Sequence, residues 1–225
     1  MNRARGWWWA IVALGASVAA AIVVYAGLAV LAPLQTAHAQ VPDAAWPYQR
    51  PIVRQAQARF GPEAPAARIA AQLHQESAWR PAVCSGAGAC GLAQFMPGTG
   101  AWLADLFPNE LAPADPFEPA WAIQANVYYN HWLYQRARNW SDECERWAGV
   151  LSAYNGGLTW VNRDRRLAAE AGAEPSRWFG AVEDYSRRAA WAFRENRGYV
   201  RRILTELEPR YASAGWPGDP VCRTR

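Results

Sequence analysis

Glu76 is the acidic residue whose position best suits acid–base chemistry. It follows Ile69 by seven residues and Leu73 by three, so on a helix it shares their apolar stripe near the helix C-terminus. A carboxylate there is partly removed from water and close to the negative end of the helix dipole, and both effects raise its pKa. A carboxyl group that keeps its proton near neutral pH can act as a general acid. The alternative is a boundary glutamate paired with Arg80.

The elements that must position Glu76 are predicted to be helices. Apolar residues recur at helical spacing from Pro51 almost to the end, and no alternating strand pattern or internal repeat is present. Glycines 86, 88 and 91 make residues 84–91 a loop. The expected helices are residues 51–60, 65–79, 97–107, 119–138, 142–154, 160–171 and 198–213. We therefore expect an all-α, predominantly helical domain large enough to bury a full core.

The N-terminal segment has the features of an export signal. Residues 7–34 carry no charged side chain, follow Arg3 and Arg5, and precede the small-x-small triplet at 37–39. As a helix, residues 7–32 would be about 39 Å long, enough to cross a bilayer. The domain is thus expected to be exported, either soluble after cleavage near Ala39 or anchored in the inner membrane through residues 7–32, with the N-terminus in the cytoplasm.

The expected domain organisation follows from these patterns. Residues 1–39 are a signal peptide or signal-anchor helix, residues 40–50 a linker rich in Pro and Trp, residues 51–213 a single catalytic domain and residues 214–225 a tail. The arginines before residues 7–34 favour an N-terminus in the cytoplasm and the bulk of the chain on the other side of the membrane.

The four cysteines all follow the N-terminal segment, where an oxidising compartment favours disulfides. Three connectivities are possible. Cys84 and Cys90 are near enough in sequence to close one loop, which would pair Cys144 with Cys222. Zinc is the rival interpretation. However, only His74 and His131 follow the N-terminal segment, and the sequence has no H-E-x-x-H and no paired C-x-x-C, so we expect neither a metal site nor another cofactor.

The charge balance argues against nucleic acid as a partner. The formal net charge is +4, and the 23 basic residues are all arginines, set against 19 acidic ones. Without Arg3 and Arg5 the net charge falls to +2, and the basic residues are interspersed with acidic ones. Such a distribution is too weak for a nucleic-acid groove.

Four short motifs occur in order along the chain. Residues 75–81 read Q-E-S-A-W-R-P, Ser85 follows Glu76 by nine residues, and residues 88–94 read G-A-C-G-L-A-Q. Further on, residues 153–157 read A-Y-N-G-G and residues 195–200 read E-N-R-G-Y-V. This series resembles the soluble lytic transglycosylase (SLT) family of the lysozyme-like α+β superfamily, over roughly residues 51–211. The family's usual Phe is here Trp79, and Cys90 occupies a free position of the G-A-x-G motif.

The resemblance implies cleavage of the β-1,4 bond between N-acetylmuramic acid and N-acetylglucosamine in peptidoglycan. The muramic 6-hydroxyl would attack the anomeric carbon and leave a 1,6-anhydro end. One carboxyl group suffices, with Glu76 acting as acid and then as base, whereas an ordinary glycosidase uses two carboxyl groups. The nearest acidic residue after Glu76 is Asp105, beyond the glycine loop. Peptidoglycan strands are the expected partner of a monomeric enzyme, used in wall remodelling or phage-type host lysis.

The motif positions also imply roles for individual residues. Tyr154 would steady the Glu76 carboxyl or an oxocarbenium-like centre. Residues implied to bind or surround the sugars are Ser85, Gln94, Asn155, Glu195 and Tyr199. Structural alternatives remain for several: Tyr154 and Asn155 could cap a helix, Tyr199 could be a core tyrosine, and Glu195 could form an exposed ion pair.

Two other functions compete with this interpretation. A goose-type lysozyme has a similar fold and catalytic glutamate but admits water in place of the 6-hydroxyl. A peptidoglycan-binding protein without catalysis is the second alternative, against which the retained Glu76 argues. The sequence leaves open phage or bacterial origin, and whether cleavage begins within glycan chains or at their ends.

Overall fold

The computed structural model describes residues 40–222. The predicted signal or anchor segment, residues 1–39, lies outside this range. Between residues 40 and 222, no helix is long and apolar enough to span a bilayer.

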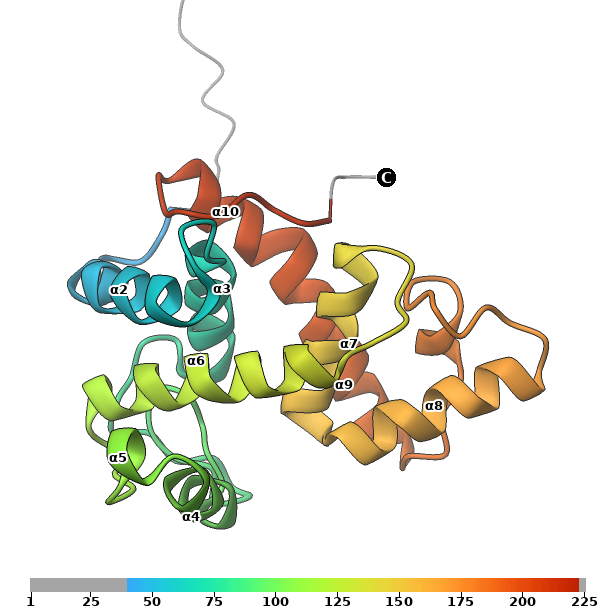
Figure 1. The fold of residues 1–225 in the computed structure, drawn as a ribbon, viewed down its shortest axis with the longest axis horizontal. Helices are drawn as coiled ribbons and strands as arrows, with labels where there is room; N and C mark the ends of the chain where they lie inside the picture. The colour runs from blue at the N-terminus through green and yellow to red at the C-terminus, as the bar shows by residue number, and fades with distance from the viewer. Residues whose placement is uncertain (1–39, 223–225) are drawn as a thin grey trace, which may run out of the picture. The chain divides into compact units, whose positions relative to one another are not determined.

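The described chain is helical, as expected (Figure 1). Its elements in chain order are η1 (Asp43–Tyr48), α2 (Gln49–Phe60), α3 (Ala66–Ser77), α4 (Pro97–Leu106), α5 (Pro108–Leu111), α6 (Pro119–Arg136), α7 (Glu143–Gly156), α8 (Leu158–Glu170), η2 (Val182–Asp184), α9 (Ala190–Arg202), η3 (Ile203–Leu207) and α10 (Glu208–Ser213). Within residues 40–222, β pairing is limited to two isolated bridges, Cys84 with Cys90 and Cys90 with Phe95. The prediction of a predominantly helical domain is confirmed.

The core forms around α3 and α6. Residues 66–73 of α3 are all buried, and this helix packs against α2, η3 and α10. The long helix α6 lies against α2 on one side and α7 on the other, with α4 and α5 below it in Figure 1. Helix α7 in turn packs against α8 and α9. The two central helices therefore bring α2 and α10, from the two ends of the described range, to one core.

The C-terminal helical run differs from the predicted helix over residues 198–213. It begins at Ala190, eight residues earlier, and residues Ile203–Leu207 form a π-helical turn between α9 and α10. Residues 190–195 of α9 include no buried side chain, and the first buried positions of the helix are the polar Asn196 and Arg197. Their burial is stabilised by polar contacts to other segments, which periodicity cannot reveal.

Both flanks of the predicted domain pack against it. In the expected linker, residues 43–48 form η1, Val41 and Ala45 are buried, and the Tyr48 ring stacks on Trp79 at 5.6 Å between centroids. In the expected tail, Trp216 is buried and its ring lies 5.1 Å from that of Tyr211. The Trp216 ring also lies 6.3 Å from that of Trp79, so aromatic contacts attach both segments to the core.

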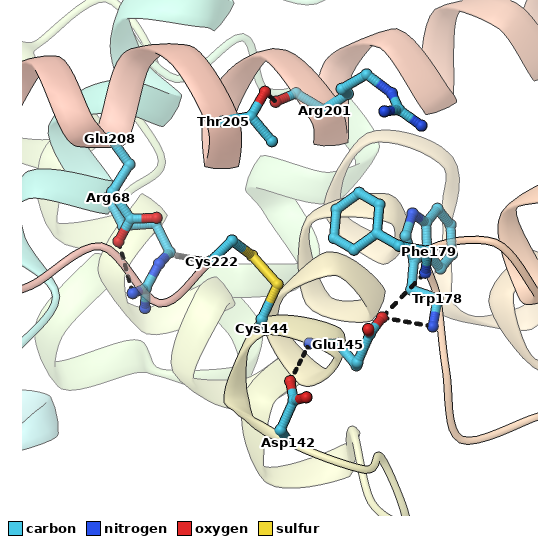
Figure 2. Close-up of a disulfide and its surroundings, with 10 residues drawn as sticks. All are labelled: Arg68, Asp142, Cys144, Glu145, Trp178, Phe179, Arg201, Thr205, Glu208 and Cys222. Atoms are coloured by element: carbon cyan, nitrogen blue, oxygen red, sulfur yellow. Dashed lines mark hydrogen bonds and ion pairs between the residues drawn. A yellow bond between two sulfur atoms is a disulfide. The ribbon is translucent and has the colours of Figure 1, made fainter. Parts of the chain in front are cut away.

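The structure confirms the favoured disulfide pairing, Cys84 with Cys90 and Cys144 with Cys222. Figure 2 shows the second bond joining the C-terminal segment to the start of α7. Beside it, Arg68 of α3 and Glu208 of α10 form a buried ion pair at 2.6 Å. The start of α7 is capped by Asp142, which accepts a hydrogen bond from the Glu145 backbone N–H at 3.0 Å. The C-terminal segment is thereby held to two helices.

Candidate active site

One cleft of about 380 Å³ contains every residue predicted to take part in chemistry or binding. Its walls come from α3, the loop between α3 and α4, α6, α7 and α9. Its lining includes Glu76, Ser85, Gln94, Tyr154, Asn155, Glu195 and Tyr199. A larger open hollow of about 1200 Å³, lined by residues 135–143 and Arg146, contains none of these seven.

Glu76 lies in the last turn of α3, where the backbone turns sharply. The helix ends at Ser77, and Ala78 and Trp79 both have positive φ, 48° and 66°. The turn is stabilised from the core, because the buried Trp79 indole donates a hydrogen bond to the Tyr211 hydroxyl at 2.7 Å. Arg80, the alternative partner of Glu76, donates instead to the Ser77 carbonyl at 3.0 Å.

The surroundings of Glu76 raise the pKa of its carboxyl from 4.5 to about 8. Burial is the largest cause, because it disfavours the charged form, and the nearby negative charge of Glu195 acts in the same direction. A hydrogen bond from the Tyr199 hydroxyl to Oε1, 2.5 Å long, opposes them by stabilising the carboxylate. The net effect leaves Glu76 protonated at neutral pH, as a general acid requires.

Two of the three tyrosines that line the cleft, Tyr154 and Tyr199, have different hydrogen-bond partners. Tyr199, expected to line the groove, is the residue that bonds the Glu76 carboxyl. The Tyr154 hydroxyl instead donates to the Ala93 carbonyl at 2.9 Å. Burial raises the pKa of both hydroxyls well above the ordinary value, so both rings stay neutral. The contact with the Glu76 carboxyl that was expected of Tyr154 is therefore made by Tyr199.

Three buried amides behind the cleft were not predicted to take part in the site. Gln72 Nε2 donates to the Tyr199 oxygen at 3.0 Å, and Asn130 Nδ2 donates to Gln72 Oε1 at 2.7 Å. Asn130 Nδ2 also lies 3.1 Å from Asn126 Oδ1, and Asn126 Nδ2 donates to the Tyr154 oxygen at 3.1 Å. The sequence spacing could have indicated them. Gln72 precedes Glu76 by four residues and Asn126 precedes Asn130 by four, so the members of each pair lie on the same face of a helix.

The loop from α3 to α4 forms the wall opposite α9. Its Cys84–Cys90 disulfide closes the turn, and the Ser85 Oγ accepts a hydrogen bond from the Ala89 N–H at 3.1 Å. Gln94, predicted to bind sugar, uses its amide nitrogen within the loop, donating to the carbonyls of Gly91 at 2.8 Å and Val83 at 3.0 Å. Both amide hydrogens are thus committed to shaping the loop.

Asn155 and Glu195 lie at the α7–α9 side of the cleft. Asn155 Oδ1 accepts a hydrogen bond from Asn196 Nδ2 at 2.8 Å, so its side chain is oriented from α9. Glu195 is exposed, and among the described residues it forms no ion pair, the structural alternative considered for it.

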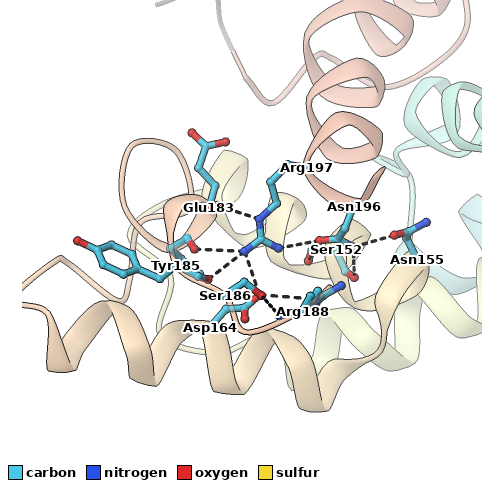
Figure 3. A network of polar contacts seen from close by, with 10 residues as sticks. Ser152, Asn155, Asp164, Glu183, Tyr185, Ser186, Arg188, Asn196 and Arg197 are labelled. Atoms are coloured by element: carbon cyan, nitrogen blue, oxygen red, sulfur yellow. Dashed lines mark hydrogen bonds and ion pairs between the residues drawn. The ribbon is translucent and has the colours of Figure 1, made fainter. Parts of the chain in front are cut away.

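A buried arginine supports this side of the cleft (Figure 3). The Arg197 guanidinium contacts Asn196 Oδ1 at 2.9 Å and Asp164 Oδ2 of α8 at 2.9 Å, and its Nε donates to the Glu183 carbonyl. Arg188 lies 3.6 Å from the same Asp164 oxygen. This network connects α8 and the 182–188 segment to the residue that orients Asn155.

No group of three or more His, Cys, Asp or Glu side chains that could hold a metal ion occurs in the described part of the chain. The cleft presents a protonated carboxyl, Glu76, and a second, exposed carboxyl, Glu195. Such an arrangement suits proton transfer to a leaving oxygen.

Comparison with known proteins agrees with this class of site. The chain is 32% identical over 151 residues to the soluble lytic murein transglycosylase of Escherichia coli K12, covering 64% of this chain and 20% of that protein. It is 31% identical over 110 residues to the membrane-bound lytic murein transglycosylase F of Pasteurella multocida, covering 49% and 21%. The chain thus matches about a fifth of the length of each relative.

A similar fold occurs in the crystal structure of the 70 kDa soluble lytic transglycosylase of Escherichia coli. The TM-score is 0.53 at 28% identity, over 76% of this chain and 25% of that one. The family model described as Transglycosylase SLT domain matches residues 52–176, which include Glu76 and Tyr154. The chain belongs to the transglycosylase SLT domain family. The helix that carries Glu195 and Tyr199 follows the matched range.

Proposed function

We propose that this protein is a peptidoglycan lytic transglycosylase, which cleaves the β-1,4 bond between N-acetylmuramic acid and N-acetylglucosamine and forms a 1,6-anhydro end. The observation that carries the proposal is the Glu76 carboxyl, whose pKa is raised to about 8 in a cleft shared with the other motif residues. Membership of the SLT family and the names of the relatives support the same activity.

The proposed reaction uses Glu76 twice. In the first step its proton passes to the glycosidic oxygen, the bond from that oxygen to the anomeric carbon breaks, and positive charge develops at that carbon. In the second step the muramic 6-hydroxyl forms a bond to the same carbon, and its proton returns to the Glu76 carboxylate. The proton count balances without water, and Glu76 ends protonated for the next cycle.

The other cleft residues have roles that suit this chemistry. Tyr199 holds one oxygen of Glu76, and the Tyr154 oxygen lies where a lone pair can stabilise positive charge. Glu195 adds negative charge that favours both the protonated Glu76 and a cationic transition state. Ser85 and Asn155 present polar atoms to the sugar, while Gln94 mainly shapes the loop.

A goose-type lysozyme activity is the second candidate, because Glu195 provides another carboxyl on the same cleft. In a hydrolase a second carboxylate activates water or stabilises the cation. The products distinguish the two reactions, since hydrolysis leaves a reducing end and the transglycosylase leaves an anhydro end lighter by one water. A protein that binds peptidoglycan without cleaving it would release neither.

The test is digestion of purified sacculi with a protein that begins at Gln40, followed by mass spectrometry of the released muropeptides. Glu76→Gln is the matched control, since it keeps the side-chain volume but has no transferable proton. We expect anhydro-muropeptides from the wild type and a rate reduced by about a thousandfold or more in the variant. Reducing ends would establish the lysozyme, and no release from either protein would favour a binding role.

The proposed location is the periplasm, as the names of the soluble and membrane-bound relatives also suggest. Residues 1–39 would serve as a cleaved signal or as an inner-membrane anchor through residues 7–32, and the domain would work as a monomer on glycan strands. Fractionation of cells that express the full chain tests the two forms. A shortened protein in the soluble fraction indicates cleavage near Ala39, and a full-length protein in the membrane fraction indicates the anchor.

A further inference from the structure

The three buried amides behind the cleft join two of its tyrosines, Tyr199 and Tyr154, in one continuous chain of hydrogen bonds. The chain begins at the Glu76 carboxyl and ends at the Ala93 carbonyl, and its successive members are Tyr199, Gln72, Asn130, Asn126 and Tyr154. The three amide residues are at most 1% exposed. Because they do not reach the cleft surface, they can act only through the tyrosines.

The backbone determines the direction of this chain. Asn130 lies 2.9 Å from the Asn126 carbonyl, which can only accept, so the Asn130 atom facing it must be the amide nitrogen. That nitrogen donates to Gln72, so Gln72 faces it with Oε1 and turns Nε2 toward Tyr199. Since the Tyr199 oxygen accepts this bond, its own hydrogen is free to point at Glu76.

The other end is determined in the same way. The Ala93 carbonyl can only accept, so the Tyr154 hydroxyl must donate its hydrogen there. The Tyr154 oxygen therefore accepts from Asn126 Nδ2, and Asn126 turns Oδ1 toward Asn130. Asn130 Nδ2 has two hydrogens and gives one to Gln72 Oε1, so the other is shared between the backbone carbonyl and Oδ1 of Asn126. The two backbone carbonyls, of Asn126 and Ala93, thus determine which end of each amide side chain is nitrogen and which is oxygen.

We infer that Gln72, Asn130 and Asn126 are positioning residues that fix the hydroxyl protons of Tyr199 and Tyr154. Tyr199 then always donates to Oε1 of Glu76, which places the transferable proton on Oε2. Tyr154 has no hydrogen left to donate and presents a lone pair to the cleft, where the proposed reaction develops positive charge. This inference rests on the proposed function.

Gln72→Met is the sharpest test, because it keeps the side-chain length and removes the donor to Tyr199. We expect kcat on sacculi to fall about tenfold, the loss that follows from one misplaced hydrogen bond, with KM unchanged within about twofold. The alkaline limb of the pH profile should move upward, because a weakened bond from Tyr199 no longer lowers the pKa of Glu76. The other titratable groups around Glu76 stay in place: Glu195 from α9, Tyr154 from α7 and Tyr129 from α6.

Ile123→Val is the control for a purely structural effect. Ile123 is equally buried on α6 and does not line the cleft, and its truncation by one methyl group lowers stability modestly. Its kcat and pH limb should equal those of the wild type. If Gln72→Met matches this control in both measurements, the inference is overturned.

Gln72→Glu tests the direction of the bond. At about pH 5 a buried carboxyl is neutral, and its O–H can donate to Tyr199 in place of the amide N–H. We expect this variant to recover most of the activity that Gln72→Met loses at acidic pH, and to lose it as the new carboxyl ionises and draws the Tyr199 hydrogen away from Glu76. Equal activity of the two variants at about pH 5 would refute the assigned direction. Release of anhydro-muropeptides by the wild type shows separately whether the proposed function holds.

Discussion

At the scale of single residues, the site depends on keeping one carboxyl protonated. Burial opposes ionisation of Glu76, Glu195 adds to that effect, and the Tyr199 hydrogen bond limits it. The position of Glu76 in the last turn of α3 is what brings it to the cleft wall beside α9. The acid is thus prepared by its surroundings before substrate binds.

The pKa of Glu76 predicts the pH dependence of catalysis. The acid step needs the protonated form, which persists up to about pH 8, so kcat/KM should fall as pH rises through about 8. The measurement is muropeptide release from sacculi across a pH series. Glu195→Gln should move this limb to lower pH, because it removes a charge that raises the pKa. A limb near pH 5 in the wild type would contradict the assignment of the acid.

The same carboxyl should reduce stability at neutral pH. Its folded-state pKa of about 8 exceeds the ordinary 4.5, so between these values the unfolded chain releases a proton that the folded protein keeps. Glu76→Gln should therefore be more stable than the wild type at pH 7, and the advantage should grow as pH rises from about 4.5 to about 8. Thermal unfolding at several pH values measures it. An advantage independent of pH would contradict the linkage.

At the scale of elements, the loop between α3 and α4 needs a glycine at position 91. Gly91 has φ 81°, and a Cβ there would lie 1.7 Å from the Pro116 carbonyl oxygen. This close approach holds the loop against Pro116, in the segment before α6. Within the loop, the Gln94 amide donates a hydrogen bond to the Gly91 carbonyl. The shape of this cleft wall thus depends on the absence of a Cβ atom at Gly91.

Gly91→Ala should displace this wall. We expect lower activity on sacculi and a lower melting temperature, since the clash is with backbone and the φ angle is unfavourable for alanine. Gly86→Ala in the same loop is the matched control, because its added Cβ meets no atom within 4 Å. Equal activity of the two variants would show that the contact with Pro116 does not shape the cleft.

At the scale of the whole described unit, the contacts that hold the C-terminal segment lie outside the cleft. The Cys144–Cys222 disulfide closes a separation of 78 residues, and the Arg68–Glu208 ion pair lies beside it, while neither touches the cleft. Burial raises the pKa of Glu208, whereas its bond to Arg68 opposes that shift. These contacts attach the C-terminal segment to α3 and α7.

Replacing both Cys144 and Cys222 by Ala should lower the free energy of unfolding by about 2–5 kcal/mol, because the unfolded chain regains the entropy of a long loop. Activity per folded molecule should not change at temperatures well below unfolding. Denaturant unfolding and sacculus digestion measure the two quantities. A fall in activity without a fall in stability would mean that the bond shapes the cleft.

The sequence by itself determined the helical class, the acid candidate and the set of residues around one cleft, and it favoured one of three possible disulfide pairings. These features depend on local spacing: periodicity marks the helices, and short motifs carry Glu76, Tyr154 and Tyr199. The roles assigned to those residues remain predictions for the experiments above.

Only the tertiary structure decided which tyrosine bonds Glu76, that Gln72 and the α6 amides connect the two tyrosines, and that residues 43–48 pack against the domain. The Tyr199–Glu76 bond joins positions 123 residues apart, and the Gln72–Asn130 bond joins positions 58 apart. The sequence around a buried amide in a helix is the same whether or not a hydrogen-bond partner on another helix faces it. Its partner is set by the packing of α3 against α6 and α9, because hydrogen bonds require distances near 3 Å that sequence spacing cannot specify.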